Sequence, residues 1–177
     1  MVQSPQLGVN RGYLANAEHV RTRGVELDGS ALVSNFLKFN ASVNYTDGRY
    51  VSFRNAPLPL EETGKTENGQ QVGYKDISGC KLPGISNWAS SVVLELFAKG
   101  KLIGQSGQYF VGSDILYRSS FSSSPSPSQY LNIDGYTLVN ARLGFRTQKG
   151  ITVFVWGRNV GNKNYFEELL PATGNIG

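Results

Sequence analysis

Arginine, lysine and tyrosine side chains in two long polar segments are the residues of this sequence best suited to bind a small molecule. The segments span about 51–85 and 114–134 and are rich in Pro, Gly, Ser and charged residues. Guanidinium groups bind anions, and aromatic faces attract cations, so this mixture suits a small charged or aromatic molecule. We predict that the following residues contact ligand: Arg54, Tyr74, Lys75, Arg118 and Tyr130. Arg49, Tyr50 and Tyr117 are further candidates of the same types.

A second set of charged residues recurs at alternate positions within apolar stretches. Its members are Glu26, Asp28, Lys38, Glu95, Arg142, Arg146 and Arg158, with Arg23, Asn40 and Asn44 beside them. A dry core cannot hold so many unpaired charges, so we expect these residues to share a wet face. The three arginines at 142, 146 and 158 are expected to pair with Glu26, Asp28 or Glu95, or to contact another part of the protein.

Several classes of site lack the residues they require. His19 is the only histidine and Cys80 the only cysteine, which excludes a Ser-His triad, an internal disulfide and a His-pair metal site. The acidic residues near 61–76 lack the spacing of a calcium loop. The net charge is +4, but Lys and Arg are scattered rather than clustered as in nucleic-acid binders. We therefore predict no enzyme activity, no cofactor, no metal site and no nucleic-acid partner.

Strict alternation marks the elements that must position these residues. In FLKFNASVNY, residues 36–45, apolar positions 37, 39, 41, 43 and 45 alternate with polar ones, which indicates a strand with different surroundings on its two faces. Similar patterns predict six strands at about 19–33, 36–50, 86–98, 101–113, 135–147 and 151–160. Short turns are expected at Ser34-Asn35, Lys99-Gly100 and Gln148-Lys149-Gly150. The predicted fold is all-β, an antiparallel up-and-down meander.

The connections alternate between short and long, which places every short turn at one end of the sheet and every long segment at the other. Outer-membrane barrels have this asymmetry, and their strands of about 9–11 residues match the predicted lengths. The apolar face needs a cover, and the sequence offers no amphipathic helix to supply one. Lipid is the simpler cover, although a soluble meander with one wet face stays an alternative. Tyr45, Tyr50, Tyr109 and Tyr136, near strand ends, are then expected in the interfacial aromatic girdle.

Five motifs resemble TonB-dependent outer-membrane receptors. HVRTRGVELDGSA (19–31) resembles a barrel strand with T-x-G-x-E, and KDISGCKLPGISNW (75–88) resembles the descending L-P-G-x-x-x-W loop. YFVGSDI (109–115) is similar to a Y-x-G strand end, and GYTLVNARLGF (135–145) to a strand that begins Y-x-L. GRNVGNKNYFEE (157–168) resembles N-L-x-D-K-x-Y, with Val160 and Asn162 at the departures. Together they cover nearly the whole chain in the family's order.

This resemblance implies a 22-stranded transmembrane barrel around an N-terminal plug in the outer membrane of a Gram-negative bacterium. It implies active import of scarce nutrients, most often ferric siderophores, energised by the TonB complex through the plug. Residues 1–177 would then form a partial barrel domain without the plug or the final strand, since LPATGNIG (170–177) indicates a loop. A passive porin-type fragment and a soluble β-meander binding module are the alternative functions.

Overall fold

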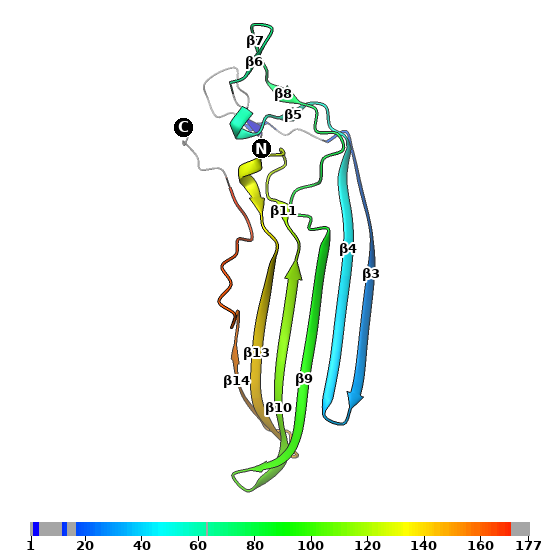
Figure 1. The fold of residues 1–177 in the computed structure, drawn as a ribbon, viewed down its shortest axis with the longest axis vertical. Helices are drawn as coiled ribbons and strands as arrows, with labels where there is room; N and C mark the ends of the chain where they lie inside the picture. The colour runs from blue at the N-terminus through cyan, green and yellow to red at the C-terminus, as the bar shows by residue number, and fades with distance from the viewer. Residues whose placement is uncertain (1, 4–11, 14–16, 63, 171–177) are drawn as a thin grey trace.

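The computed structural model describes residues 2–3, 12–13, 17–62 and 64–170. One six-stranded antiparallel sheet dominates it, in the order β14-β13-β10-β9-β4-β3 (Figure 1). The strands are β3 (His19–Ser34), β4 (Leu37–Ser52), β9 (Trp88–Leu102), β10 (Gln105–Arg118), β13 (Tyr136–Thr147) and β14 (Thr152–Gly157). Each pairs with its sequence neighbour, so the predicted all-β, up-and-down meander is confirmed.

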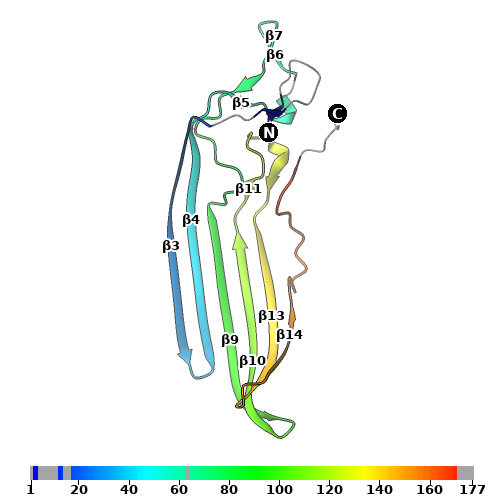
Figure 2. The ribbon, with the colours of Figure 1, turned by 180° about the vertical axis from the view of Figure 1, so that it is seen from behind.

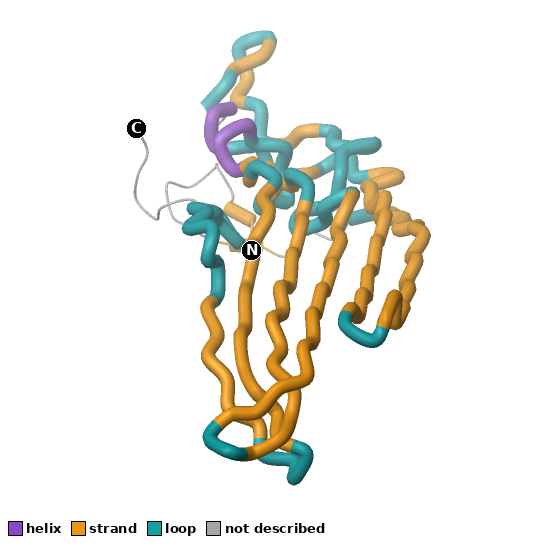
Figure 3. Tube along the Cα trace, turned by 60° about the horizontal axis from the view of Figure 1, so that its bottom comes forward, coloured by secondary structure: helices purple, strands orange, loops and turns teal. Residues whose placement is uncertain are grey.

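The short turns gather at one end of the sheet and the long connections at the other, in both views (Figures 1 and 2). We call these the turn end and the loop end. The sheet bends into an open arc when seen from its turn end (Figure 3). Within the described residues, β3 pairs only with β4 and β14 only with β13, so both edges of the arc are open.

The second tight turn is not where the sequence predicted it. Lys99 and Gly100 continue β9 and pair with Gln108 and Gly107 of β10, and the chain reverses at Ile103-Gly104. The Lys-Gly pair has the residue types of a turn, but Gly100 lies within the strand. The Tyr109 ring occupies the space that a side chain of residue 100 would fill. Such covering of a strand glycine by an aromatic ring stabilises a sheet. The hairpin is therefore longer than predicted.

The other two turns lie close to their predicted places. The first occupies Asn35 and Phe36, because β3 extends to Ser34, which pairs with Leu37. The third lies at residues 148–150 as predicted, with the Thr147 amide donating to the Ile151 carbonyl. The last strand ends at Gly157 rather than at 160, although the Val160 amide still donates to the Val139 carbonyl of β13.

The register keeps one apolar and one polar face through the middle of the six strands. Val25, Val43 and Val92, for example, lie on the same face as Leu94 and Leu143, and much of this face is exposed. Val25 is 71% and Leu27 72% exposed, values that no soluble core would leave. At the loop end, Arg23 lies on the same side as Val25 and pairs with Asp47 (3.4 Å), so its expected place on the polar face is wrong. No helix in the described part of the chain is long and apolar enough to cross a membrane.

The long connections fold into small pieces of their own at the loop end. Residues 53–87 contain β5 (Ala56–Pro57), η2 (Leu60–Glu62), β6 (Thr66–Glu67), β7 (Gln70–Gln71) and β8 (Tyr74–Lys75), in which β5 pairs with β8 and β6 with β7. Residues 119–135 contain β11 (Phe121–Ser122), η3 (Gln129–Leu131) and β12 (Asn132–Ile133). Near the N-terminus, β1 (Val2–Gln3) pairs with β2 (Gly12–Tyr13). The segment 171–177, predicted as loop, lies outside the described residues.

Candidate functional site

An ion-pair cluster spans three strands on the polar face. Arg142 on β13 reaches Glu95 on β9, with 2.5 Å from Nη2 to Oε2 and 3.1 Å from Nε to the same oxygen. Its Nη1 lies 3.2 Å from Asp114 on β10. Glu95 is one of the three partners suggested from the sequence for the arginines of this face. The cluster joins β13 to β9 over the strand between them.

Gly112 makes this crossing possible. It stands between Glu95 and Arg142 in the register of the sheet. A Cβ at this position would lie 2.8 Å from Nε and 3.0 Å from Cγ of Arg142. Arg142 therefore crosses β10 to reach Glu95 only because the middle residue has no side chain.

Asp114 is the functional residue of this cluster that sequence analysis missed. The predicted strand ended at 113, so Asp114 was placed in the following polar segment. The signal was present, because the apolar row of Tyr109 and Val111 resumes at Ile115 and Tyr117, which places Asp114 on the opposite face of the same strand.

The remaining charged residues of the polar face have other surroundings. Lys38 stands opposite Glu95 in the register, whereas Glu26 and Asp28 face Asn44 and Ser42. Arg146 lies over the ring of Phe110, with 5.6 Å from Cζ to the ring centroid. Arg158 lies one residue beyond β14, over the ring of Trp156 at 5.2 Å. Both arginines thus contact aromatic faces, and no ion pair involves either in the described part of the chain.

Short polar side chains give the other half of this face a different character. Asp28, Ser30, Asn40, Ser42 and Ser91 border a shallow hollow of about 310 Å³. Carboxylate, amide and hydroxyl groups can all exchange hydrogen bonds with water or a hydrophilic solute. The wall is therefore wettable where the ion-pair cluster is absent.

At the loop end, Glu61 connects the two long connections. Its carboxylate accepts hydrogen bonds from the Ser128 hydroxyl (2.9 Å) and the Gln129 amide (2.8 Å). Partial burial acts to raise the pKa of Glu61, but hydrogen bonds from its own amide, from Gln129 and from Ser128 outweigh it and lower the pKa. Glu61 is thus held in the charged form that these donors require.

Three of the predicted ligand-binding residues lie near groups of this chain. Arg118 donates to Ser86 Oγ (2.7 Å) and to the Gly84 carbonyl (2.6 Å), and its guanidinium covers Phe121 at 3.7 Å. Lys75 pairs with Glu62 at 2.6 Å. Arg54 is exposed and lies within electrostatic reach of Asp76, whose pKa is lowered mainly by hydrogen bonds from the Ser78 hydroxyl and amide. These contacts show how the loops hold their shape.

The two remaining predicted residues are tyrosines with a large exposed fraction. Tyr130 is 69% exposed on η3, and Tyr74 is 48% exposed on β8. Tyr50, by contrast, is 6% exposed and packs with Phe53, Ala56 and Ile77 in a small core beneath the loops. Its predicted place in an interfacial girdle is therefore wrong, because the first long connection folds back over the polar-face side of β4.

The described residues hold no group of three or more His, Cys, Asp or Glu side chains that a metal ion would need. The chemistry that the site supports is reversible binding through rings, guanidinium groups and hydrogen bonds. A model of the TonB-dependent receptor-like β-barrel matches residues 2–160. The chain belongs to this family. Searches of curated proteins and of solved structures gave no match.

The family consists of outer-membrane transport proteins rather than enzymes. Membership in it explains why the sheet of the receptor barrel has one apolar and one polar face. In outer-membrane barrels the apolar face of each strand meets lipid and the polar face lines the lumen. The family that the sequence matches is therefore that of the receptors and not that of passive porins. The match concerns the barrel and not the mode of transport.

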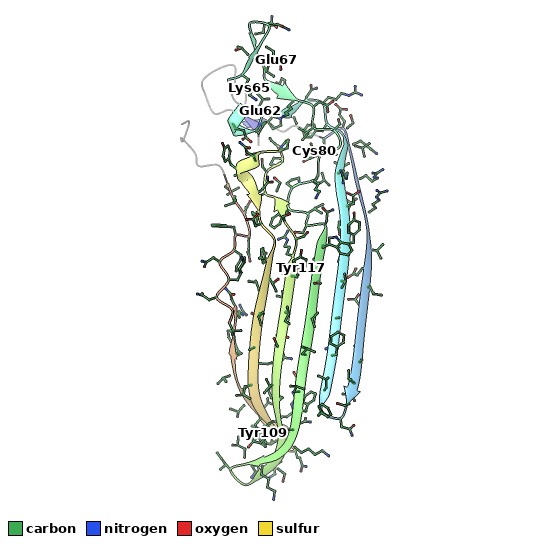
Figure 4. All side chains as sticks on the ribbon, in the orientation of Figure 1. Glu62, Lys65, Glu67, Cys80, Tyr109 and Tyr117 are labelled. Atoms are coloured by element: carbon green, nitrogen blue, oxygen red, sulfur yellow. The ribbon has the colours of Figure 1, made fainter. Side chains whose placement is uncertain are left out.

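Aromatic residues border the apolar face of the receptor barrel at both ends. Tyr45 and Trp88 pack at the loop-end border, with ring centroids 4.8 Å apart. Tyr109 and Phe145 pack at the turn-end border, 4.7 Å apart, and Figure 4 shows Tyr109 and Tyr117 near opposite ends of β10. The two tyrosines are eight positions apart, which is about 26 Å along the strand at about 3.3 Å per residue. An apolar band about 25 Å tall is typical of outer-membrane barrels.

Tyr136 was also predicted in this girdle, and that prediction is wrong. Its register partner is Arg118, and it shares the polar face with Asn140 and Arg142. Its ring packs instead on Tyr165, with centroids 4.7 Å apart. The alternation of β13 decides the face, and an aromatic residue near a strand end need not face lipid.

Proposed function

We propose that this chain forms part of the barrel wall of an active importer that takes up ferric siderophore complexes and is energised by TonB. Family membership supplies the class of outer-membrane transport protein. The observation that carries the substrate is the group of exposed aromatic and basic side chains at the loop end, above a wettable lumen wall. Polyanionic and catecholate chelates suit such a group, because guanidinium groups pair with anions and rings contact flat ligands.

The exposure of the loop residues divides the predicted ligand contacts into two roles. Tyr130, Tyr74 and Arg54 present their side chains outward and are the proposed direct contacts. Arg118 and Lys75 fix the loops that carry them, through their contacts with Gly84, Ser86 and Glu62. Loss of a direct contact should weaken binding alone, whereas loss of a positioning residue should also loosen the loops.

The proposal also places this chain within a larger barrel. A six-stranded arc with two open edges leaves hydrogen-bonding groups that further strands must pair in a membrane. We propose that a complete barrel of the family size encloses a plug, and that the plug connects the receptor to the TonB complex in the inner membrane. The plug would lie against the face that carries Arg142, Arg146 and Arg158.

Uptake of a labelled ferric catecholate chelate by cells that express the complete protein tests this function. We expect uptake that requires both TonB and the proton-motive force. The variant Tyr130→Ala should weaken chelate binding about tenfold, a typical loss for an exposed aromatic contact, while Tyr130→Phe should retain most of it. Uptake that is independent of TonB would instead identify a passive pore. A complete protein that stays monodisperse without detergent would refute the membrane transporter altogether and favour a soluble binding module.

A further inference from the structure

Three cationic side chains stand opposite one another at the loop end of β3 and β4. Arg21 pairs with Arg49 in the register of the sheet, and Arg49 forms a β-bridge with Lys81 of the first long connection. Figure 4 labels the neighbouring Cys80 beside the loop end of β4. Like charges directly opposite each other on one face of a sheet are destabilising. Folding alone therefore does not account for this row of cations.

A single carboxylate compensates part of the charge. Asp47 lies 2.7 Å from Nε of Arg49 and 3.4 Å from Nε of Arg23, and its side chain is only 5% exposed. In the part of the chain that the structure describes, no ion pair involves Arg21 or Lys81. Lys81 Nζ donates to Asn87 Oδ1, which is neutral. Four cations thus share one buried carboxylate, and the cluster has an excess of positive charge.

The cluster lies on the same face as the apolar surface. Arg23 and Arg21 follow Val25 at alternate positions of β3, and the register is regular from Val20 to Leu32. Val25 is aligned with Tyr45 and Trp88, the aromatic pair at the loop-end border.

The height of the cluster above that border matches lipid headgroups. At about 3.3 Å per residue and a strand tilt of about 40°, Arg23 stands about 5 Å and Arg21 about 10 Å beyond the aromatic pair. The headgroup layer on each side of a bilayer is roughly 5–8 Å thick. Long arginine and lysine side chains can reach across the remaining distance.

The residue types indicate which part of a headgroup would bind. Guanidinium groups form paired hydrogen bonds with phosphate, and lysine binds it as a point charge. All four cations are accessible, with Arg23 68% and Arg49 42% exposed and the other two exposed as well. Below them, Val25 is 71% and Trp88 49% exposed, so the site continues into a surface for acyl chains. A lipid satisfies both parts, whereas a soluble anion satisfies only the first.

We propose that Arg21, Arg23, Arg49 and Lys81 bind the phosphate groups of an anionic lipid in the leaflet at the loop end. This inference rests on the proposed function for the placement of the chain in a membrane. The bound phosphate neutralises the row of cations and holds the base of the first long connection, which carries the proposed ligand contacts Arg54 and Tyr74.

Native mass spectrometry of the complete protein tests the site. The delipidated protein in detergent is mixed with equimolar phosphatidylglycerol and phosphatidylcholine, and the retained lipids are counted. Wild type should prefer phosphatidylglycerol. Arg21→Gln should lower that preference about fivefold, the usual contribution of one cation at an anionic surface. Lys99→Gln is the matched control, because Lys99 is an exposed cation on the polar face of the turn end, and it should leave the preference unchanged.

Thermal unfolding separates lipid binding from a structural role of Arg21. In neutral detergent without added lipid, Arg21→Gln should raise Tm by about 1–2 °C, because it removes a like charge opposite Arg49 and breaks no ion pair. Added phosphatidylglycerol should raise the Tm of wild type more than that of Arg21→Gln, because only wild type has the full site. A purely structural role would leave the difference in Tm independent of lipid.

Three results would overturn the proposal. The first is an equal preference for phosphatidylglycerol in wild type and Arg21→Gln. The second is a rise in Tm with inorganic phosphate as large as that with phosphatidylglycerol, which would identify a site for soluble anions. The third is a photocrosslinker in place of Lys81 that captures a protein in cells instead of lipid.

The outcomes for the lipid site and for transport are separable. A protein with TonB-dependent uptake and no phosphatidylglycerol preference contradicts only the lipid site. A protein with the preference but without uptake contradicts only the proposed cargo or energisation.

Discussion

Replacing Gly112 with alanine should destabilise the sheet, although alanine is the better residue for most strands. The new Cβ would lie 2.8 Å from Nε of Arg142 and would push the guanidinium away from Glu95 and Asp114. Charge-assisted hydrogen bonds contribute about 1.5–3 kcal/mol each when shielded from water. Arg142 and Asp114 are about one-third exposed, at 31% and 33%, so screening places the loss near the lower part of that range for the whole cluster.

The gain in strand propensity partly offsets this loss. Removing a glycine from a strand stabilises by about 0.5–1 kcal/mol. We therefore expect Gly112→Ala to lower the free energy of unfolding by about 0.5–1.5 kcal/mol. Gly29→Ala is the matched control, because a Cβ there meets nothing within 4 Å, and it should be neutral or slightly stabilising.

Urea unfolding of the complete protein in lipid vesicles gives the required free energies. A double-mutant cycle with Arg142→Ala locates the effect. If Gly112 acts by leaving room for Arg142, then Gly112→Ala should lose its penalty in the Arg142→Ala background and resemble Gly29→Ala. An unchanged penalty in that background, or no penalty in the wild-type background, would refute the explanation.

Two further predictions concern the loop end and the turn end. Glu61→Gln should speed hydrogen exchange of the Gln129 amide, and low pH should have the same effect. The pKa of Glu61 is lowered in the folded protein. The contact between the two loops is therefore complete above about pH 4.5 and is lost as the pH falls through the folded pKa. Exchange of this amide that does not change between pH 6 and pH 3, after correction for intrinsic rates, would contradict the assignment. Gly107→Ala should lower the free energy of unfolding by about 3 kcal/mol, more than Gly112→Ala does. The reason is that its Cβ would lie 2.3 Å from the Arg146 carbonyl oxygen, so that rigid backbone must move. Equal free energies of unfolding for the two variants would exclude this order.

The alternation of side chains was sufficient to predict the strands and their two faces. Val25 and Leu27 alternate with Glu26 and Asp28, and the pleat of a strand converts this directly into an apolar and a polar side. The turn at Ile103 could not be predicted in the same way, because its residue type opposes its conformation. Lys99-Gly100 matched local turn chemistry, but Gly100 lies beneath the ring of a residue on the neighbouring strand.

The candidate site was harder to predict because its contacts join distant segments. Arg118 has the residue type of an anion-binding side chain, yet its guanidinium binds Ser86 and Gly84, more than thirty positions earlier. Tyr50 has the type and place of an interfacial aromatic residue, yet the folded loop covers it. The local sequence predicts the type of a residue and the face of the strand on which it lies. Whether another loop covers that residue depends on tertiary contacts, which the alternation pattern does not encode.

The alternation of tight turns and long connections also sets an order of assembly. The three hairpins β3–β4, β9–β10 and β13–β14 close over two or a few residues, whereas β4 meets β9 only across residues 53–87. Closing a longer loop costs more chain entropy and takes longer, so the hairpins should form first as separate units. The small core of Tyr50, Phe53, Ala56 and Ile77 then draws the ends of that long connection together. The connection that carries the proposed ligand contacts Arg54, Tyr74 and Lys75 is therefore also expected to join one finished hairpin to the next as the sheet assembles.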